Sequence, residues 1–334
     1  MRVHVELSEE FDVDAHALAH ARDETPDRTP YGLHHLADVD GVELTYRHPL
    51  RGRAAWLARG VRNRLGDHEV VAEVLGAARR DRRRADVVLC MDERTGVPAA
   101  LRPGGPPVVV NVIWVQRPES YPPAVRRVLG LALRRVAGLI VQSESLRGDL
   151  VDGWGLDPAR VHRVHTGIDA AFFPPQPWTD GSVTVASVGD DRYRDHPLLV
   201  DAAGRLASRG AAVRLEIGTT IPDVVVPPEL GEVHRERMEG RVRALYRRAG
   251  VVALALRPTT AGSGTTVVLE AAASARPVVA TRTPAMEDLI EDGVRGLLVA
   301  PEDPDALADA LGALLADPAR ARAMGEAARA WLET

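Results

Sequence analysis

Short apolar runs rich in valine, leucine and isoleucine alternate along the chain with longer Ala, Leu and Arg segments of helical period. This alternation is typical of parallel sheets whose two faces are covered by helices. In the first half, the runs that predict strands are 2–7, 42–46, 86–90, 107–112, 138–142 and 161–165. The segments 68–83 and 122–136 predict helices. We therefore expect an α/β fold.

The segment from Phe172 to Ser182 interrupts this alternation. It has three prolines, turn-forming residues at its end and neither a helical nor a strand period, which is typical of a linker. The alternation then restarts, with strands expected at 183–188, 212–217, 250–256 and 277–281 and helices at 196–208, 239–249, 265–275, 304–316 and 317–333. A chain of 334 residues suits two cores of roughly 150 residues each.

We predict two Rossmann-like, doubly wound domains that face a central cleft. The N-terminal domain spans 1–172 and the C-terminal domain spans 183–318, while a helix at 319–334 could pack back toward the N-terminal domain. Ligands of such sheets bind beyond the carboxyl ends of the strands. The cleft between the two domains is therefore the expected site.

The composition excludes several classes of protein. A net charge of -5 gives no general attraction to nucleic acid or to an anionic membrane. No run approaches the roughly 20 apolar residues that span a bilayer, and the first residues lack the features of a signal peptide. We expect a cytoplasmic protein without stable membrane insertion. Cys90, the only cysteine, lies in an apolar run and is expected to be a buried structural thiol.

The segment from Pro258 to Pro277 carries the most informative chemistry. A strand ends near Leu256, a loop of small residues follows, and a helix begins at about Thr265. Small residues let a ligand approach the backbone, and the free amides of a first helical turn suit a phosphate. Glu270 lies about one and a half turns into that helix, where it could reach hydroxyls attached to the same phosphate. On composition alone, a Gly-Ser loop with a solvated glutamate is the simpler interpretation.

Longer stretches of sequence point to a family. The segments Leu269–Thr281, Met286–Val299 and Asp303–Leu311 resemble the retaining GT-B glycosyltransferases of glycosyltransferase family 4, and so do 137–150, 164–174 and 188–200. The resemblance runs in consistent order from about 137 to 320 and is only architectural before that. It implies a GT-B fold and the transfer of a sugar, with retention, from a nucleoside-diphosphate sugar. The acceptor would be a soluble small molecule in a bacterial biosynthetic pathway, such as one for a natural product.

The resemblance also implies roles for individual residues. Glu270 matches a glutamate that holds the nucleotide ribose, and Arg194 matches a lysine that contacts phosphate; all basic residues of this chain are arginine. Arg194 and Glu270 are the catalytic candidates, because a departing diphosphate needs electrostatic stabilisation. The candidates for binding the donor lie at loop positions and strand ends: Gly262, Ser263, Gly264, Thr265, Thr266, Gly189, Gly218, Arg235, Tyr31, Gly32 and Trp114. Trp114 could instead line the acceptor side or pack in the core.

The sequence departs from the family pattern at four places. Gly262 stands where a glutamate usually contacts the donor sugar, and Asp190 stands where an arginine is common. The Gly-Gly loop after the first strand is missing, and Ile113-Trp114 replaces a histidine after the 107–112 strand. The sugar half of the site is therefore altered. This leaves open an unusual donor sugar or, as the alternative, a non-catalytic GT-B protein that binds a nucleotide or accompanies an active enzyme.

No metal or other cofactor is expected, since GT-B enzymes usually work without one. Asp190 and Asp191 are interpreted as a solvated ion-pair cluster with Arg192 and Arg194. The pairs His34-His35 and His162/His165 have no carboxylate at metal-ligand spacing, so surface or capping roles are expected. The basic run 79–84 predicts a solvated helix end rather than a nucleic-acid site. The expected partners are a nucleotide sugar and a small-molecule acceptor.

Overall fold

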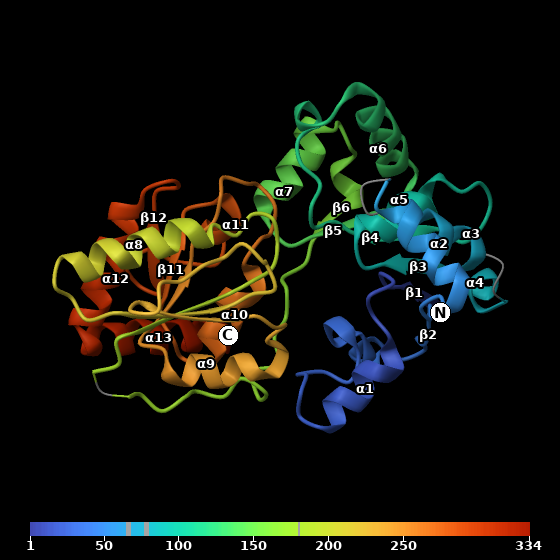
Figure 1. Cartoon of the computed structure of the whole chain (residues 1–334). Helices are drawn as coiled ribbons and strands as arrows, with labels where there is room; N and C mark the ends of the chain where they lie inside the picture. The colour runs from blue at the N-terminus through green and yellow to red at the C-terminus, as the bar shows by residue number, and fades with distance from the viewer. Residues whose placement is uncertain (65–67, 77–79, 180) are drawn as a thin grey trace. The chain divides into compact units, whose positions relative to one another are not determined.

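The computed structural model describes residues 1–64, 68–76, 80–179 and 181–334 of the chain. These residues form two compact units, Met1–His165 and Thr166–Thr334 (Figure 1). Each unit has a six-stranded sheet in which neighbouring strands are parallel. The prediction of an α/β fold with two Rossmann-like, doubly wound domains is confirmed.

The sheet of the first unit has the strand order β2-β1-β3-β4-β5-β6. Its strands are β1 (Arg2–Glu6), β2 (Glu43–Tyr46), β3 (Val87–Cys90), β4 (Val108–Asn111), β5 (Gly138–Val141) and β6 (Val161–Arg163). Because β2 and β3 pair with opposite sides of β1, the order reverses at β1, and the loop after β1 lies at the switch point of the sheet.

The helices in the N-terminal half of the first unit differ from the predicted helices. They are α1 (Val13–Ala21), α2 (Gly52–Arg62), α3 (Val70–Gly76), α4 (Arg80–Arg84), α5 (Glu93–Leu101), α6 (Pro123–Arg135) and α7 (Glu144–Gly148). Short turns of other helix types are η1 (Pro30–Asp38), η2 (Pro118–Ser120), η3 (Asp149–Gly153) and η4 (Pro158–Arg160). The single helix expected at 68–83 is α3 and α4, and residues 77–79 between them lie outside the described part of the chain.

Cys90 ends β3 within the main core of the first unit, where β3, β4 and β5 pack against α5 and α6. Its side chain is fully buried, and burial raises the pKa of the thiol well above its usual value. A thiol held in its neutral form is a poor nucleophile. Cys90 is therefore the buried structural residue that its apolar neighbours in the sequence predict.

The sheet of the second unit has the order β12-β11-β10-β7-β8-β9. Its strands are β7 (Thr184–Val188), β8 (Arg214–Gly218), β9 (Gly231–His234), β10 (Val251–Leu254), β11 (Val278–Thr281) and β12 (Gly296–Val299). Its helices are α8 (His196–Ser208), α9 (Val242–Arg248), α10 (Thr265–Ala273), α11 (Pro284–Glu287), α12 (Pro304–Ala316) and α13 (Pro318–Leu332), with a short turn η5 (Glu239–Arg241). The chain starts at β7 in the middle and winds to both sides, so the switch point lies between β7 and β10.

Both faces of this sheet are buried, which explains its continuous apolar strands. In β10, Val251 and Ala253 pack with residues of α8 and α12, whereas Val252 and Leu254 pack with residues of α9 and α10. Alternate residues of a strand point to opposite faces, so four consecutive apolar residues serve two cores. Figure 1 shows α8 and α12 on one side of the sheet and α9 and α10 on the other.

The proline-rich segment after residue 172 is held by the second unit. Phe172 and Phe173 are buried in its core, and the Arg276 guanidinium donates to the carbonyl of Pro177 at 2.8 Å. Arg329 of α13 donates to the carbonyls of Ala170, Phe173 and Ala273 at 2.6–3.2 Å. Among the described residues, the structure contains no helix that is long and apolar enough to cross a membrane.

Candidate functional site

Two loops at the switch point of the second unit come together beside the first turn of α10. The loop after β7 pairs with the loop after β10: the Asp195 amide donates to Ala255 O at 3.0 Å, and the Arg257 amide donates to Tyr193 O at 2.8 Å. Arg194 lies between these contacts, in a bridge with Leu256. The predicted residues Gly189, Arg194, Ser263, Gly264 and Glu270 thereby reach the same edge of the sheet.

Arg194 crosses this edge with its guanidinium buried. Only 8% of the residue is exposed, and a Cβ added at Gly189, which has φ 149°, would lie 2.1 Å from Nε. Glycine is therefore required at 189 to admit the arginine. The Nε atom lies 2.9 Å from Asp191 Oδ2, yet neither Nε nor Nη1 makes a hydrogen bond within the described part of the chain.

The charge on Arg194 is only partly compensated by its neighbours. Burial lowers the pKa of the guanidinium, against the opposing effects of Asp191, Tyr246 and Glu270. A buried cation with open donors is costly unless an anion pairs with it. The site is thus electrostatically prepared for a bound anion such as phosphate.

The first turn of α10 adds backbone donors to this guanidinium. Gly264 is the N-cap residue with φ 86°, and no side chain caps the helix. A Cβ at Gly264 would lie 2.4 Å from Leu254 Cδ2, so glycine lets the loop lie on β10. Thr265 Oγ1 donates to Gly262 O at 2.8 Å, and Thr266 is exposed. The uncapped amides and the helix dipole make this turn suitable for an anion.

Glu270 sits behind this turn and shares a hydrogen bond with Tyr246 of α9. The Tyr246 hydroxyl donates to Glu270 Oε2 at 2.8 Å. Burial raises the pKa of Glu270 to about 7, while Tyr246 and Arg194 lower it. Near neutral pH the carboxyl group is therefore partly protonated. It donates a hydrogen bond to a ligand hydroxyl when protonated and accepts one when ionised.

Tyr246 was not among the residues predicted for the site. Its ring is fully buried in the core of the second unit. A buried tyrosine needs a partner for its hydroxyl, so a tyrosine on the apolar face of the expected helix at 239–249 was the available signal. The identity of that partner could not be inferred, because Glu270 is 24 residues away along the chain.

Asp190 and Asp191 do not form the solvated cluster that the sequence analysis expects. Asp191 accepts from Ser263 Oγ at 2.8 Å and pairs with buried Arg194. Asp190 instead accepts from Thr219 Oγ1 at 3.0 Å. The solvated interpretation is wrong for Asp191 and Arg194, because the loop after β7 packs against the loop after β10, whereas Asp190 and Arg192 are exposed.

Gly218 and Arg235 lie further along the same edge. Gly218 ends β8, accepts from the Gly189 amide at 3.1 Å, and has no room for a Cβ because Met238 Cγ would lie 2.4 Å away. Arg235 follows β9 and donates to the carbonyls of Ile221, at 3.0 Å, and Val224. Arg235 therefore holds the loop after β8, while base binding by either residue stays a prediction.

Tyr31, Gly32 and Trp114 belong to the first unit. Tyr31 and Gly32 have φ angles of 61° and 65° at the start of η1, and the Tyr31 ring lies 5.4 Å from that of Phe11. The Trp114 amide donates to Glu93 Oε1 at 2.7 Å. Contact of these residues with a donor or acceptor stays a prediction.

Buried charges line the carboxyl edge of the first sheet, which the sequence analysis did not predict. Arg82 belongs to the basic run 79–84 but is buried, with Nη1 3.1 Å from Glu6 and 2.5 Å from Glu73. A solvated role is therefore wrong for Arg82, whereas Arg83 and Arg84 are exposed. Residue 79 lies outside the described residues.

Glu93 is a second carboxyl group with a pKa near neutrality. Its oxygens accept from the amides of Ile113 and Trp114, at 3.1 and 2.7 Å, directly after β4. Burial raises its pKa to about 7. Glu93 thus holds the loop that stands where the family pattern has a histidine.

Comparison with known proteins matches both halves of the chain to glycosyltransferase family models. Residues 12–172 match the model described as Glycosyltransferase Family 4, and residues 182–317 match Glycosyl transferases group 1. A D-inositol 3-phosphate glycosyltransferase of Kribbella flavida is 29% identical over 242 residues, which is 63% of this chain and 56% of the relative. One from Kineococcus radiotolerans is 32% identical over 226 residues, covering 56% and 51%. The chain spans about half the length of the curated relatives it matches.

Solved structures support the fold. Sucrose-phosphate synthase from Thermosynechococcus elongatus has a TM-score of 0.74 at 16% identity and covers 100% of this chain and 94% of its own. Anabaena Alr3699/HepE, in complex with UDP and glucose, has a TM-score of 0.64 at 18% identity, covering 100% and 95%. These likenesses confirm the predicted GT-B fold.

Proposed function

Because the chain belongs to the glycosyltransferases of family 4 and group 1, we propose that it transfers a sugar from a nucleoside-diphosphate sugar to a soluble small-molecule acceptor. The observation that carries this proposal is the buried Arg194 with open donors, next to the uncapped first turn of α10. That pairing suits a diphosphate, the group that every nucleotide-sugar donor contains. Further support comes from an Anabaena neighbour whose structure holds UDP and glucose.

Different residues of the second unit bind different parts of the donor. Arg194 and the amides of 264–266 bind the diphosphate, and Glu270 accepts from the ribose hydroxyls while Tyr246 holds its carboxyl group. When the sugar leaves, negative charge grows on the diphosphate. Fixed donors that point at this charge lower the barrier without the need for a protein acid. No metal is needed at this site, because the guanidinium and the helix dipole supply the positive charge.

The sugar end of the donor must be bound by a residue other than Gly262. Gly262 offers no side chain, but Ser263 next to it donates to Asp191. Asp191 has about a fifth of its side chain exposed, so its carboxylate can still accept from a ligand. We assign Asp191 to the hydroxyls of the sugar, in the part of the loop where Gly262 lacks a carboxylate.

The names of the relatives support an inference about the acceptor. Those from Kribbella flavida and Kineococcus radiotolerans are named for D-inositol 3-phosphate, a soluble polyol phosphate. We infer an acceptor of this broad class, transfer with retention and a place in a bacterial biosynthetic pathway in the cytoplasm. A non-catalytic, nucleotide-binding role remains the second candidate, because Gly262 and Asp190 both depart from the family pattern.

A turnover assay separates the two candidates. The full chain is incubated with UDP-, GDP- and dTDP-sugars, with and without D-inositol 3-phosphate and other polyols, and nucleoside diphosphate release and product anomer are followed by NMR. The proposal expects release that depends on acceptor and a product with the anomeric configuration of the donor. Tight nucleotide binding without release for any donor and acceptor would favour the non-catalytic role. An inverted product would overturn retention alone.

A further inference from the structure

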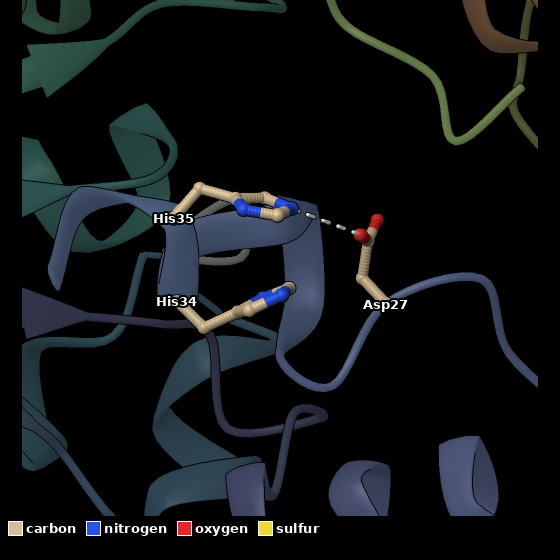
Figure 2. Close-up of side chains that lie close together, drawn as sticks. All are labelled: Asp27, His34 and His35. Atoms are coloured by element: carbon tan, nitrogen blue, oxygen red, sulfur yellow. Dashed lines mark ion pairs between the residues drawn. The ribbon is translucent and has the colours of Figure 1, made fainter. Parts of the chain in front are cut away.

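Asp27, His34 and His35 lie close together in the first unit, in the segment that also contains Tyr31 and Gly32 (Figure 2). One potential ligand atom from each residue lies within 4.8 Å of those of the other two. The imidazole rings lie with their centroids 4.0 Å apart, and His35 Nε2 is 3.9 Å from Asp27 Oδ1. Figure 2 shows both rings directed toward the side of the segment that carries Asp27.

The backbone explains how these residues meet. Tyr31 and Gly32 both have positive φ angles, so the chain turns sharply at the start of η1. The Asp27 carboxylate lies 3.5 Å from where a Cβ of Gly32 would be. Consecutive residues of a regular helix diverge by about 100°, yet these two histidine rings lie side by side with their planes tilted by 35°. The turn therefore creates an arrangement that sequence spacing alone does not predict.

Both histidines have an oxygen partner at Nδ1. Thr29 Oγ1 lies 3.3 Å from His34 Nδ1 and also accepts from the His34 amide at 2.8 Å. Asp38 Oδ2 lies 3.3 Å from His35 Nδ1. Metal-binding histidines typically have such a partner on one ring nitrogen, which orients the other nitrogen toward the metal. Nε2 is therefore the nitrogen that each ring can offer to a metal.

The charges around the cluster also suit a cation. Asp27 and Asp38 bring two carboxylates close to His35, with Nε2 3.9 Å from Asp27 Oδ1 and Nδ1 3.3 Å from Asp38 Oδ2. A second cluster among the described residues, Glu216, Glu232 and His234, differs because Arg248 and Arg214 neutralise its acids.

We propose that Asp27, His34 and His35 bind a divalent transition-metal ion of the zinc class. Two imidazoles and one carboxylate favour such ions over magnesium or calcium. Three protein ligands leave at least one coordination position for water. The side chains need small shifts to reach ligand distances of about 2.0–2.2 Å. The bound ion fixes residues 27–35 in the connection between α1 and β2, and this role is independent of the proposed transferase function.

The test is calorimetric titration of the full chain, without an affinity tag, with Zn²⁺ alone. We expect one ion to bind per chain. Asp27→Asn and His35→Ala should each lower the affinity for Zn²⁺ at least tenfold. The side chain of His35 is 68% exposed. His162→Ala, which removes an exposed histidine elsewhere in the same unit, should bind as the parent does. Circular dichroism verifies that each variant is folded.

Two results would overturn the proposal. One is the absence of Zn²⁺ binding to the parent chain. The other is binding that Asp27→Asn and His35→Ala leave unchanged, since the ion would then lie elsewhere. If His35→Ala does not fold, the isosteric Asp27→Asn still decides between these outcomes, because it removes the charged ligand with almost no change of shape.

Discussion

Arg194 shows how strongly a single side chain constrains the loops around it. Its guanidinium requires glycine at 189, pairs with Asp191 and faces Glu270. Burial works against its charge, and two of its nitrogens make no hydrogen bond within the described residues. This combination costs stability in the unliganded protein and is typical of groups retained for binding or catalysis.

We predict that Arg194→Met lowers the melting temperature of the unliganded chain, because the variant leaves the partly buried Asp191 without its ion-pair partner. The same variant should abolish the rise in melting temperature that a nucleoside diphosphate causes in the parent. Thermal unfolding with and without the nucleotide measures both effects. A variant that is still stabilised by the nucleotide as the parent is would remove Arg194 from the site.

Glu270 predicts a pH dependence. Burial raises its pKa from 4.5 to about 7 in the folded chain, so the folded state holds a proton that the unfolded state loses over this window. The contribution of Glu270 to stability therefore falls as pH rises from about 4.5 to 7. Binding through ribose hydroxyls needs the deprotonated form, so affinity for a nucleotide sugar should rise as pH increases through about 7.

Calorimetry between pH 6 and 8 with a nucleotide sugar measures this dependence. The diphosphate of a nucleotide sugar is esterified at both ends and does not titrate in this range. Glu270→Gln should show a flat profile, and Tyr246→Phe should move the midpoint to higher pH, because the Tyr246 hydroxyl lowers the pKa of Glu270. Identical profiles for the parent and Glu270→Gln would contradict the assignment.

At the scale of elements, the start of α10 depends on glycine at one position and not at its neighbour. Gly264→Ala places a Cβ at φ 86° against Leu254 and should cost about 1–3 kcal/mol of unfolding free energy. Gly262 has a negative φ, and a Cβ added there would lie 3.4 Å from Thr265 Oγ1. We therefore expect Gly262→Ala to change the free energy of unfolding by less than about 1 kcal/mol. Urea unfolding of both variants is the measurement, and equal costs would contradict this account of the loop.

The sequence predicts every strand of the first sheet, including its edge strands β2 and β6, and the central strands of the second sheet, but not the edges of the second sheet. β10 and β11 are buried on both faces and are continuous apolar runs, so their pattern is unambiguous. β9 and β12, the two edge strands of the second sheet, were not expected, and β9 consists of four partly buried or exposed residues after a proline pair. Weak burial leaves an edge strand with little pattern to detect.

The candidate site was predictable in its backbone but not in its side-chain contacts. The glycines and the start of α10 follow from local sequence. The Tyr246–Glu270 hydrogen bond, the Ser263–Asp191 contact and the Asp27–His34–His35 cluster depend on how loops fold back. Asp191 and Ser263 are 72 residues apart along the chain, so no local pattern links them.

At the scale of the whole molecule, each of the two doubly wound units matches a glycosyltransferase family model. In the second unit, the buried cation, the uncapped helix and the near-neutral carboxyl group share the edge where the strand order reverses. Such a switch point is where open α/β sheets bind ligands. The central claim is therefore that this edge binds a nucleotide-sugar donor.

Calorimetric titration of the full chain with UDP-, GDP- and dTDP-sugars tests this claim most directly. Arg194→Met serves as the site variant, and Arg209→Met serves as the matched control, because Arg209 lies just after α8 and pairs with exposed Asp305 and Asp309. We predict that at least one nucleotide sugar binds the parent and the control with one site per chain, and binds Arg194→Met about tenfold to a hundredfold more weakly. Absence of binding by every nucleotide sugar, or equal affinities for the parent and Arg194→Met, would contradict the account.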